Sequence, residues 1–146
     1  MKLVNERNPV ILVVDDDRED RHFFREALSE ISPCITVIFQ KDTDGLLEEM
    51  ERTWPSLIFI EYRLPKENGI EFVQRLKAHS DLSDIPVVMW SNARLQPIVS
   101  AAYKAGVQLY LEKPWELKIW VQKIEKVLEH NRISRPFLSP SARLSL

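Results

Sequence analysis

Acidic side chains follow two of the apolar segments of this sequence, at the point where each segment ends. The segment 10–14 (VILVV) leads directly into three aspartates at 15–17, and the segment 57–60 (LIFI) leads into Glu61. Short, continuously apolar segments are typical of strands buried on both faces of a parallel sheet. Ligands of open parallel sheets bind at the carboxyl ends of the strands. If these two strands are neighbours, the sequence predicts a carboxylate cluster at that edge.

Two later segments add a hydroxyl group and a lysine to the same edge. Segment 87–90 (VVMW) is followed by Ser91, and segment 108–112 (QLYLE) leads to Lys113. Clustered carboxylates repel one another and burial raises their pKa values, so a cation is needed. Oxygen ligands of this kind suit Mg²⁺, with Lys113 as a fixed charge beside it. Taken singly, Asp17 could cap a helix, Ser91 could cap a turn and Lys113 could be solvated. Their joint position at strand ends favours a site.

The elements that position these residues alternate along the chain. The apolar segments are 10–14, 35–39, 57–60, 87–90 and 108–112, and stretches of helical spacing follow them at 23–31, 46–50, 72–76, 98–103 and 117–128. Asp42 and Thr43 are expected to cap the second helix, Asn68 to begin the third and Gly106 to end the fourth. Five alternations of strand and helix indicate an α/β fold, with a parallel sheet covered on both faces.

The overall composition limits the classes of function. The chain has 146 residues, of which 45% are apolar and 29% charged, and its net charge of -2 gives no reason to expect direct nucleic-acid binding. No apolar run approaches the roughly 20 residues of a membrane span, and no signal peptide is recognisable, so a cytoplasmic location is expected. Cys34 is the single cysteine, which excludes an intramolecular disulfide. No glycine lies in a nucleotide-binding pattern.

The length and the pattern together predict one domain with a tail. A chain of this size buries one core, and the periodic pattern ends near residue 130. We therefore expect a domain at 1–130. Segment 131–146 mixes Ser, Arg and Pro without periodicity and is expected to be flexible.

Four segments, in their order along the chain, resemble the signature segments of the response-regulator receiver domain of two-component signalling. They are ILVVDDDRED (11–20), LIFIEYRLPKENGIEF (57–72), PVVMWSNA (86–93) and AGVQLYLEKPW (105–115). Four segments in the correct order are far more specific than one motif. The resemblance implies a doubly wound, five-stranded parallel sheet, the (βα)5 flavodoxin-like receiver fold with strand order 2-1-3-4-5.

The resemblance also implies a metal site and a phosphoryl acceptor. Asp15 and Asp16 match the acidic pair that holds Mg²⁺ in the family, and the backbone carbonyl of Arg63 would be a further ligand beside Glu61. Glu61 stands where the family has its phosphorylated aspartate. Its extra methylene displaces the carboxylate by about 1 Å, which can cost about a hundredfold in phosphoryl transfer. We expect Glu61 to weaken both phosphorylation and Mg²⁺ binding. If no metal binds, we expect Lys113 to be the counter-ion of the acidic cluster.

The remaining matches concern the switch of the family. Ser91 matches the hydroxyl that turns toward a phosphoryl group, and Tyr110 matches the aromatic rotamer switch. Lys113 matches the lysine that binds a phosphoryl oxygen, and the Lys113–Pro114 peptide corresponds to one that is typically cis in the family. These roles are implied by the resemblance.

Three hypotheses for function follow. The first, which we favour, is a phosphorylation-independent receiver (a pseudo-receiver): a protein-interaction module locked in one state by Glu61 and without enzymatic activity. The second is a regulated receiver that accepts phosphate on Glu61 or on a neighbouring acid such as Asp16. The third interprets Asp15 and Asp17 as the D-x-D motif of a haloacid-dehalogenase-type phosphatase, although Glu19 stands where that family has Thr or Val.

The expected partners are proteins. In the receiver family they are a histidine kinase or a downstream signalling protein. The face formed by the fourth helix, fifth strand and fifth helix serves the family for output and dimerisation. It carries Tyr103, Trp115 and Ile119 here, so a homodimer through this face is expected.

Overall fold

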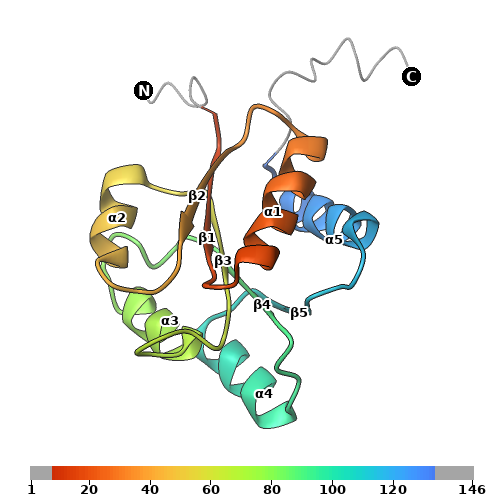
Figure 1. Cartoon of the computed structure of the whole chain (residues 1–146). Coiled ribbons are helices and arrows are strands. Elements are labelled where there is room, and N and C mark those ends of the chain that lie inside the picture. Colours follow the sequence, from red (N-terminus) through yellow and green to blue (C-terminus); the bar gives the residue numbers. More distant parts are fainter. Residues whose placement is uncertain (1–7, 134–146) are drawn as a thin grey trace.

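The computed structural model describes residues 8–133, in which five strands alternate with five helices. The elements in chain order are β1 (Val10–Val14), α1 (Arg18–Ile31), β2 (Thr36–Gln40), α2 (Leu46–Thr53), β3 (Leu57–Ile60), α3 (Gly69–Lys77), β4 (Val87–Ser91), α4 (Gln96–Ala105), β5 (Leu109–Glu112) and α5 (Leu117–His130). The strands form one parallel sheet in the order β2-β1-β3-β4-β5 (Figure 1). The predicted fold class and strand order are confirmed.

Helices cover both faces of the sheet and enclose two apolar clusters. The cluster with α1 and α5 lies on one face, and the cluster with α2, α3 and α4 lies on the other (Figure 1). Every residue of β3 and β4 is buried, which is why both strands are apolar in the sequence up to Ser91 at the end of β4. Apolar side chains on both faces of the sheet therefore pack against the helices that cover them.

Four aromatic rings form the centre of the cluster beneath α1 and α5. Phe24, Phe59, Trp90 and Trp120 are all buried, with neighbouring ring centroids 4.9–5.7 Å apart in tilted or edge-on arrangements. Such pairs stabilise a core beyond the area they bury. Within residues 8–133, the indole Nε1 of Trp90 is the one buried side-chain polar atom without a hydrogen-bond partner.

The register of the sheet places the ends of β1 and β3 side by side. Val14 pairs with Ile60, and the backbone N–H of Glu61 donates to Val14 O at 2.9 Å. The residues that follow, Asp15 and Glu61, therefore leave the sheet together. Because β1 has β2 on one side and β3 on the other, the chain reverses its direction of winding here, which is where such sheets bind ligands.

Most of the predicted helix ends agree with the structure. Asp17 is the N-cap of α1, Asn68 forms a capping box with Glu71 at the start of α3, and Gly106 ends α4 with φ 114°. These contacts fix the starts of the two helices that follow β1 and β3. The loops that carry the acids are therefore short and held at both ends.

The predicted caps of α2 are wrong. Its N-cap is Gly45, with φ 64°, and no side chain caps the helix. The carboxylate of Asp42 instead accepts from Asp44 N at 3.0 Å, and the Thr43 hydroxyl donates to Glu67 Oε1 at 2.7 Å. Because a local turn and a long-range contact use both side chains, neither of them caps the helix, which begins at Leu46.

The chain end lies partly outside the described residues. Helix α5 ends at His130, and Ile133 packs against the cluster beneath α1 and α5. Of the predicted tail at 131–146, residues 134–146 lie outside the part of the chain that the structure describes. Between residues 8 and 133, no helix has the length and apolar character needed to cross a bilayer.

Candidate functional site

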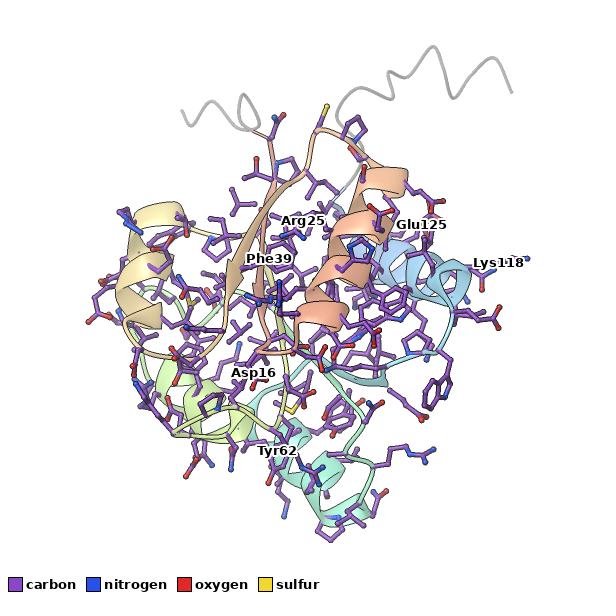
Figure 2. The ribbon with its side chains drawn as sticks, viewed as in Figure 1. Asp16, Arg25, Phe39, Tyr62, Lys118 and Glu125 are labelled. Atoms are coloured by element: carbon purple, nitrogen blue, oxygen red, sulfur yellow. The ribbon has the colours of Figure 1, made fainter. Side chains whose placement is uncertain are left out.

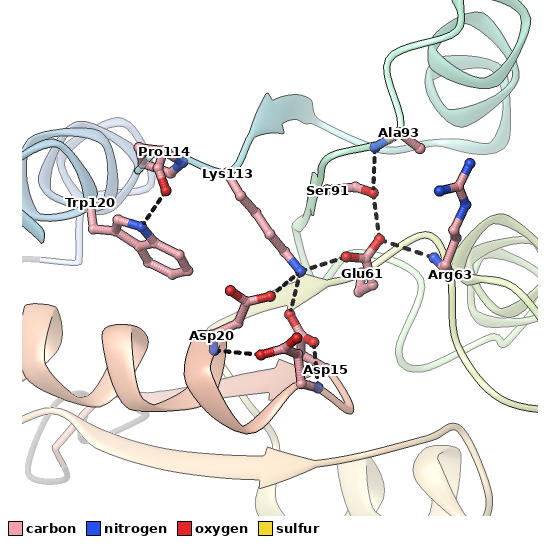
Figure 3. Close-up of polar contacts among 10 residues, drawn as sticks. Asp15, Asp20, Glu61, Arg63, Ser91, Ala93, Lys113, Pro114 and Trp120 are labelled. Atoms are coloured by element: carbon pink, nitrogen blue, oxygen red, sulfur yellow. Dashed lines mark hydrogen bonds and ion pairs between the residues drawn. The ribbon is translucent and has the colours of Figure 1, made fainter. Parts of the chain in front are cut away.

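Lys113 lies at the centre of the cluster of acids. It follows β5, and its Nζ lies 2.9 Å from Asp15 Oδ2, 2.6 Å from Asp20 Oδ2 and 2.5 Å from Glu61 Oε1 (Figure 3). Only 5% of its side chain is exposed. An ammonium group has three N–H donors, and three carboxylates surround this one. The alternative of a solvated loop lysine is therefore wrong.

Glu61 links the two groups that the receiver resemblance assigns to phosphate recognition. Its Oε1 accepts from Lys113, while its Oε2 accepts from the Ser91 hydroxyl and from the backbone N–H of Arg63 at 3.0 Å (Figure 3). Ser91 Oγ also accepts from Ala93 N at 3.1 Å, so its turn-capping role and its site role coexist. Both carboxylate oxygens of this buried Glu61 are thus bonded to donors.

The charges of the site depend on burial and on Lys113. Burial raises the pKa of Asp15 from 3.8 to about 6, because desolvation of its carboxylate outweighs the attraction of Lys113. Burial alone would lower the pKa of Lys113, but the charges of Asp15 and Glu61 raise that pKa above its usual value. Lys113 is therefore the permanent positive charge among these acids.

The second aspartate after β1 lies apart from this network. Asp16 is exposed at the carboxyl end of β1 (Figure 2), whereas Asp15 is buried beside Lys113. The third carboxylate comes instead from Asp20 in the first turn of α1, which the sequence analysis did not single out. Its spacing, one helical turn after the cap Asp17, was the available signal, because residues three apart share a helix face.

Tyr110 is half-buried and tied to the loop that follows Ser91. Its hydroxyl donates to the carbonyl of Ala93, and its backbone N–H donates to the hydroxyl of Tyr103 at 2.9 Å. Burial raises the pKa of its phenol, so Tyr110 stays a neutral donor. The switch role of Tyr110 stays a prediction. Its hydrogen bond to Ala93 ties it to the loop that follows Ser91.

The Lys113–Pro114 peptide is trans, so the cis geometry implied by the resemblance is wrong here. Trans is the intrinsically preferred isomer even before proline. In this arrangement Pro114 O accepts from the indole N–H of Trp120 at 2.9 Å (Figure 3). The loop after β5 is thus anchored to the aromatic core.

The acids of the site already have partners in the places where the family implies Mg²⁺ ligands. Asp15 Oδ1 accepts from Asp17 N at 3.0 Å, its Oδ2 contacts Lys113, and both oxygens of Glu61 have donors. Among residues 8–133, no group of three or more His, Cys, Asp or Glu side chains is arranged to hold a metal ion. The arrangement therefore does not fit Mg²⁺, and the ligand roles of Asp16 and of the Arg63 carbonyl stay predictions.

The geometry also bears on the phosphatase hypothesis. That hypothesis needs Asp15 and Asp17 on one reacting centre. Instead, Asp17 Oδ1 accepts from Asp20 N at 3.0 Å as the cap of α1, while Asp15 is bound to Lys113. The two carboxylates have separate structural tasks, which counts against this hypothesis.

Comparison with known proteins agrees with the fold. The response regulator receiver domain matches residues 11–125. Response regulator Rcp1 of Synechocystis is 32% identical over 125 residues, which cover 78% of this chain and 84% of Rcp1. The phosphate regulon regulator PhoB of Escherichia coli is 30% identical over 118 residues, covering 81% of this chain. The cyclic di-GMP phosphodiesterase response regulator RpfG of Xanthomonas campestris is 33% identical over 104 residues, covering 71% of this chain.

Solved structures of response regulators show the same fold. The Mn²⁺-bound form of Rcp1 has a TM-score of 0.72 at 26% identity, covering 83% of this chain and 92% of that one. The phosphorylated cyanobacterial phytochrome response regulator RcpA has a TM-score of 0.75 at 24% identity, covering 84% and 92%. The chain spans 28% of the length of RpfG and 51% of PhoB. The chain belongs to the response regulator receiver domain family.

Proposed function

We propose that this chain is an atypical receiver that acts as a protein-interaction module without depending on phosphorylation. The observation that carries this proposal is the Glu61 carboxylate, which bonds the Ser91 hydroxyl through one oxygen and the Lys113 ammonium through the other. In the receiver family, the corresponding hydroxyl and lysine bind the phosphoryl group. Glu61 already satisfies both of them, so the module is held in one state by its own side chain.

The imitation of a phosphoryl group is partial. A phosphoryl group carries about -1.5 to -2 charges and three acceptor oxygens, whereas a glutamate has one charge and two oxygens. Glu61 bonds Ser91 and the Arg63 N–H through Oε2 and Lys113 through Oε1, so both of its oxygens are engaged by donors. The bonds of Glu61 support loss of its function as a phosphate acceptor. They also support permanent contact of Ser91 and Lys113 with its carboxylate.

Chemical phosphorylation tests the proposal. The chain is incubated with Mg²⁺ and a small acyl-phosphate donor, and its intact mass is measured. We expect no adduct on the wild type, and we expect Glu61→Asp, the matched acceptor variant, to take up one phosphate. A stoichiometric adduct on Glu61 in the wild type would contradict the proposal and favour a regulated receiver. Turnover of phosphate monoesters would favour the phosphatase hypothesis instead.

The proposed partner is a histidine kinase or a downstream signalling protein, or a second copy of the chain. Large apolar side chains are exposed at the start of α4, within α4 and in the loop before α5: Leu95 is 65% exposed, Tyr103 44% and Trp115 93%. Exposed apolar and aromatic groups of this kind suit a protein interface. A homodimer through this face predicts a concentration-dependent sedimentation coefficient that Trp115→Ala abolishes. A monomer at all concentrations would contradict it. The cytoplasmic location stays a prediction.

A further inference from the structure

Asp20 is an acid of the site to which the receiver resemblance assigns no role. It lies in the first turn of α1, where its backbone N–H is bonded to the cap Asp17, and its side chain reaches across to Lys113 (Figure 3). The Oδ2–Nζ distance is 2.6 Å, and 19% of the Asp20 side chain is exposed. The capped helix start thus holds this carboxylate over the ammonium group.

With Asp20 in place, Lys113 has as many carboxylate partners as it has N–H donors. The three contacts of Nζ, to Asp15, Asp20 and Glu61, match the three donors of an ammonium group. Charge-assisted contacts of this length are the strong ones. Lys113 is therefore held among carboxylate oxygens of Asp15, Asp20 and Glu61, two of which, Asp15 and Glu61, the receiver resemblance assigns to a metal site.

We infer that Lys113 is the resident cation of this site, and that Asp20 is the positioning residue that holds it there and excludes a divalent metal. This inference rests on the proposed function and deepens it, because it makes the fixed state independent of the metal as well as of phosphate. The misfit of the implied Mg²⁺ site follows directly, since the oxygens of Asp15 and Glu61 are already engaged.

Removal of the Asp20 charge distinguishes this inference from simple electrostatics. If the acids merely attract cations, loss of one negative charge lowers the affinity for a divalent ion. If Asp20 holds Lys113 in the way, the same loss frees Lys113 to move and opens the oxygens of Asp15 and Glu61. The two explanations predict opposite signs for one substitution.

The experiment titrates the full chain with Mn²⁺ and measures free Mn²⁺ by electron paramagnetic resonance. We expect weak binding to the wild type. We expect Asp20→Asn to bind tighter by about ten- to a hundredfold, the range over which partners of metal ligands act. The matched control is Glu19→Gln, which removes an equal charge from an exposed neighbour in the same helical turn and should not tighten binding. An unchanged or weaker affinity of Asp20→Asn would overturn the inference.

A second variant and a second measurement complete the test. Lys113→Met should also tighten Mn²⁺ binding. This variant lacks the counter-ion of the buried acids and could therefore fail to fold. In that case Asp20→Asn, which keeps Lys113, decides the outcome. The same samples are incubated with the acyl-phosphate donor, and their intact masses are measured. Tight Mn²⁺ binding by a wild type that takes no phosphate overturns this inference alone. A phosphate adduct on Glu61 overturns the proposed function, whatever the affinity for Mn²⁺.

Discussion

Lys113 Nζ lies 2.5 Å from Glu61 Oε1, in a site where only 5% of the lysine side chain and 10% of the glutamate side chain reach solvent. These residues come from loops after different strands, 52 positions apart in the sequence. A contact so short and so buried ties the end of β3 to the end of β5 through a charge pair. The stability of the domain and the state of its site therefore depend on the same interaction.

Lys113→Met should destabilise the domain strongly. It leaves Asp15, Asp20 and Glu61 without their cation, and removal of one partner of a buried ion pair costs about 3–5 kcal/mol. Urea denaturation measures the free energy of unfolding. The matched control is Lys123→Met, whose ammonium donates to Glu112 O in an exposed position and which should cost about 1 kcal/mol or less. Equal losses in the two variants would contradict the central role of Lys113.

The buried carboxyl group of Asp15 predicts a pH dependence. Its pKa is raised from 3.8 to about 6, so between these pH values the folded chain binds a proton that the unfolded chain has lost. The contribution of Asp15 to stability is therefore greatest below the lower value and falls as the pH rises through the upper one. Asn cannot titrate. The free energy of unfolding of Asp15→Asn, relative to the wild type, should thus rise by up to about 3 kcal/mol between pH 4 and pH 7.

Thermal or urea denaturation of both proteins at several pH values measures this difference. The comparison subtracts every group that the two proteins share, so the change with pH reports on Asp15. A difference that is constant across this range, or that falls with pH, would contradict the raised pKa.

Gly69→Ala should disturb the site through the backbone. A Cβ at this position would overlap the backbone carbonyl oxygen of Glu61. Either α3 or the end of β3 must move, and overpacking of this kind costs about 1–3 kcal/mol. The amide resonances of Glu61 and Ser91 should shift in two-dimensional NMR spectra.

Gly45→Ala is the matched control for that experiment. A Cβ on Gly45 meets nothing within 4 Å, but its φ of 64° is unfavourable for an alanine by about 1–2 kcal/mol. We expect a comparable loss of stability without a shift of the Glu61 and Ser91 resonances. If both variants left these resonances unchanged, Gly69 would not position the site.

The two central tryptophans should differ in their tolerance of phenylalanine. Trp90 and Trp120 are equally buried, but only the indole N–H of Trp120 has a partner, Pro114 O at 2.9 Å. Trp120→Phe loses this hydrogen bond, whereas Trp90→Phe removes an unpaired polar group. Trp120→Phe should therefore cost about 1 kcal/mol more in the free energy of unfolding, as urea denaturation would show. Equal costs would mean that the bond contributes nothing.

The sequence alone determined the order and type of the elements. The bounds of β1 and β3 agree with the predicted segments, and Asn68 and Gly106 lie at helix ends as predicted. The reason is local: strands buried on both faces must be continuously apolar, and helix ends need particular side chains or a glycine. The same logic placed Glu61 and Lys113 at one edge of the sheet.

Only the tertiary structure decided which acids form the site. The run at 15–17 offered three aspartates, but Asp15 is buried at Lys113, Asp16 is exposed and Asp17 caps α1, while the third carboxylate comes from Asp20. Likewise, Thr43 donates to Glu67 instead of capping α2. An ammonium group has three donors. The carboxylates that bind them are those that the fold brings closest to Lys113 Nζ. Spacing along the chain cannot give these distances, because packing of the helices on the sheet sets them.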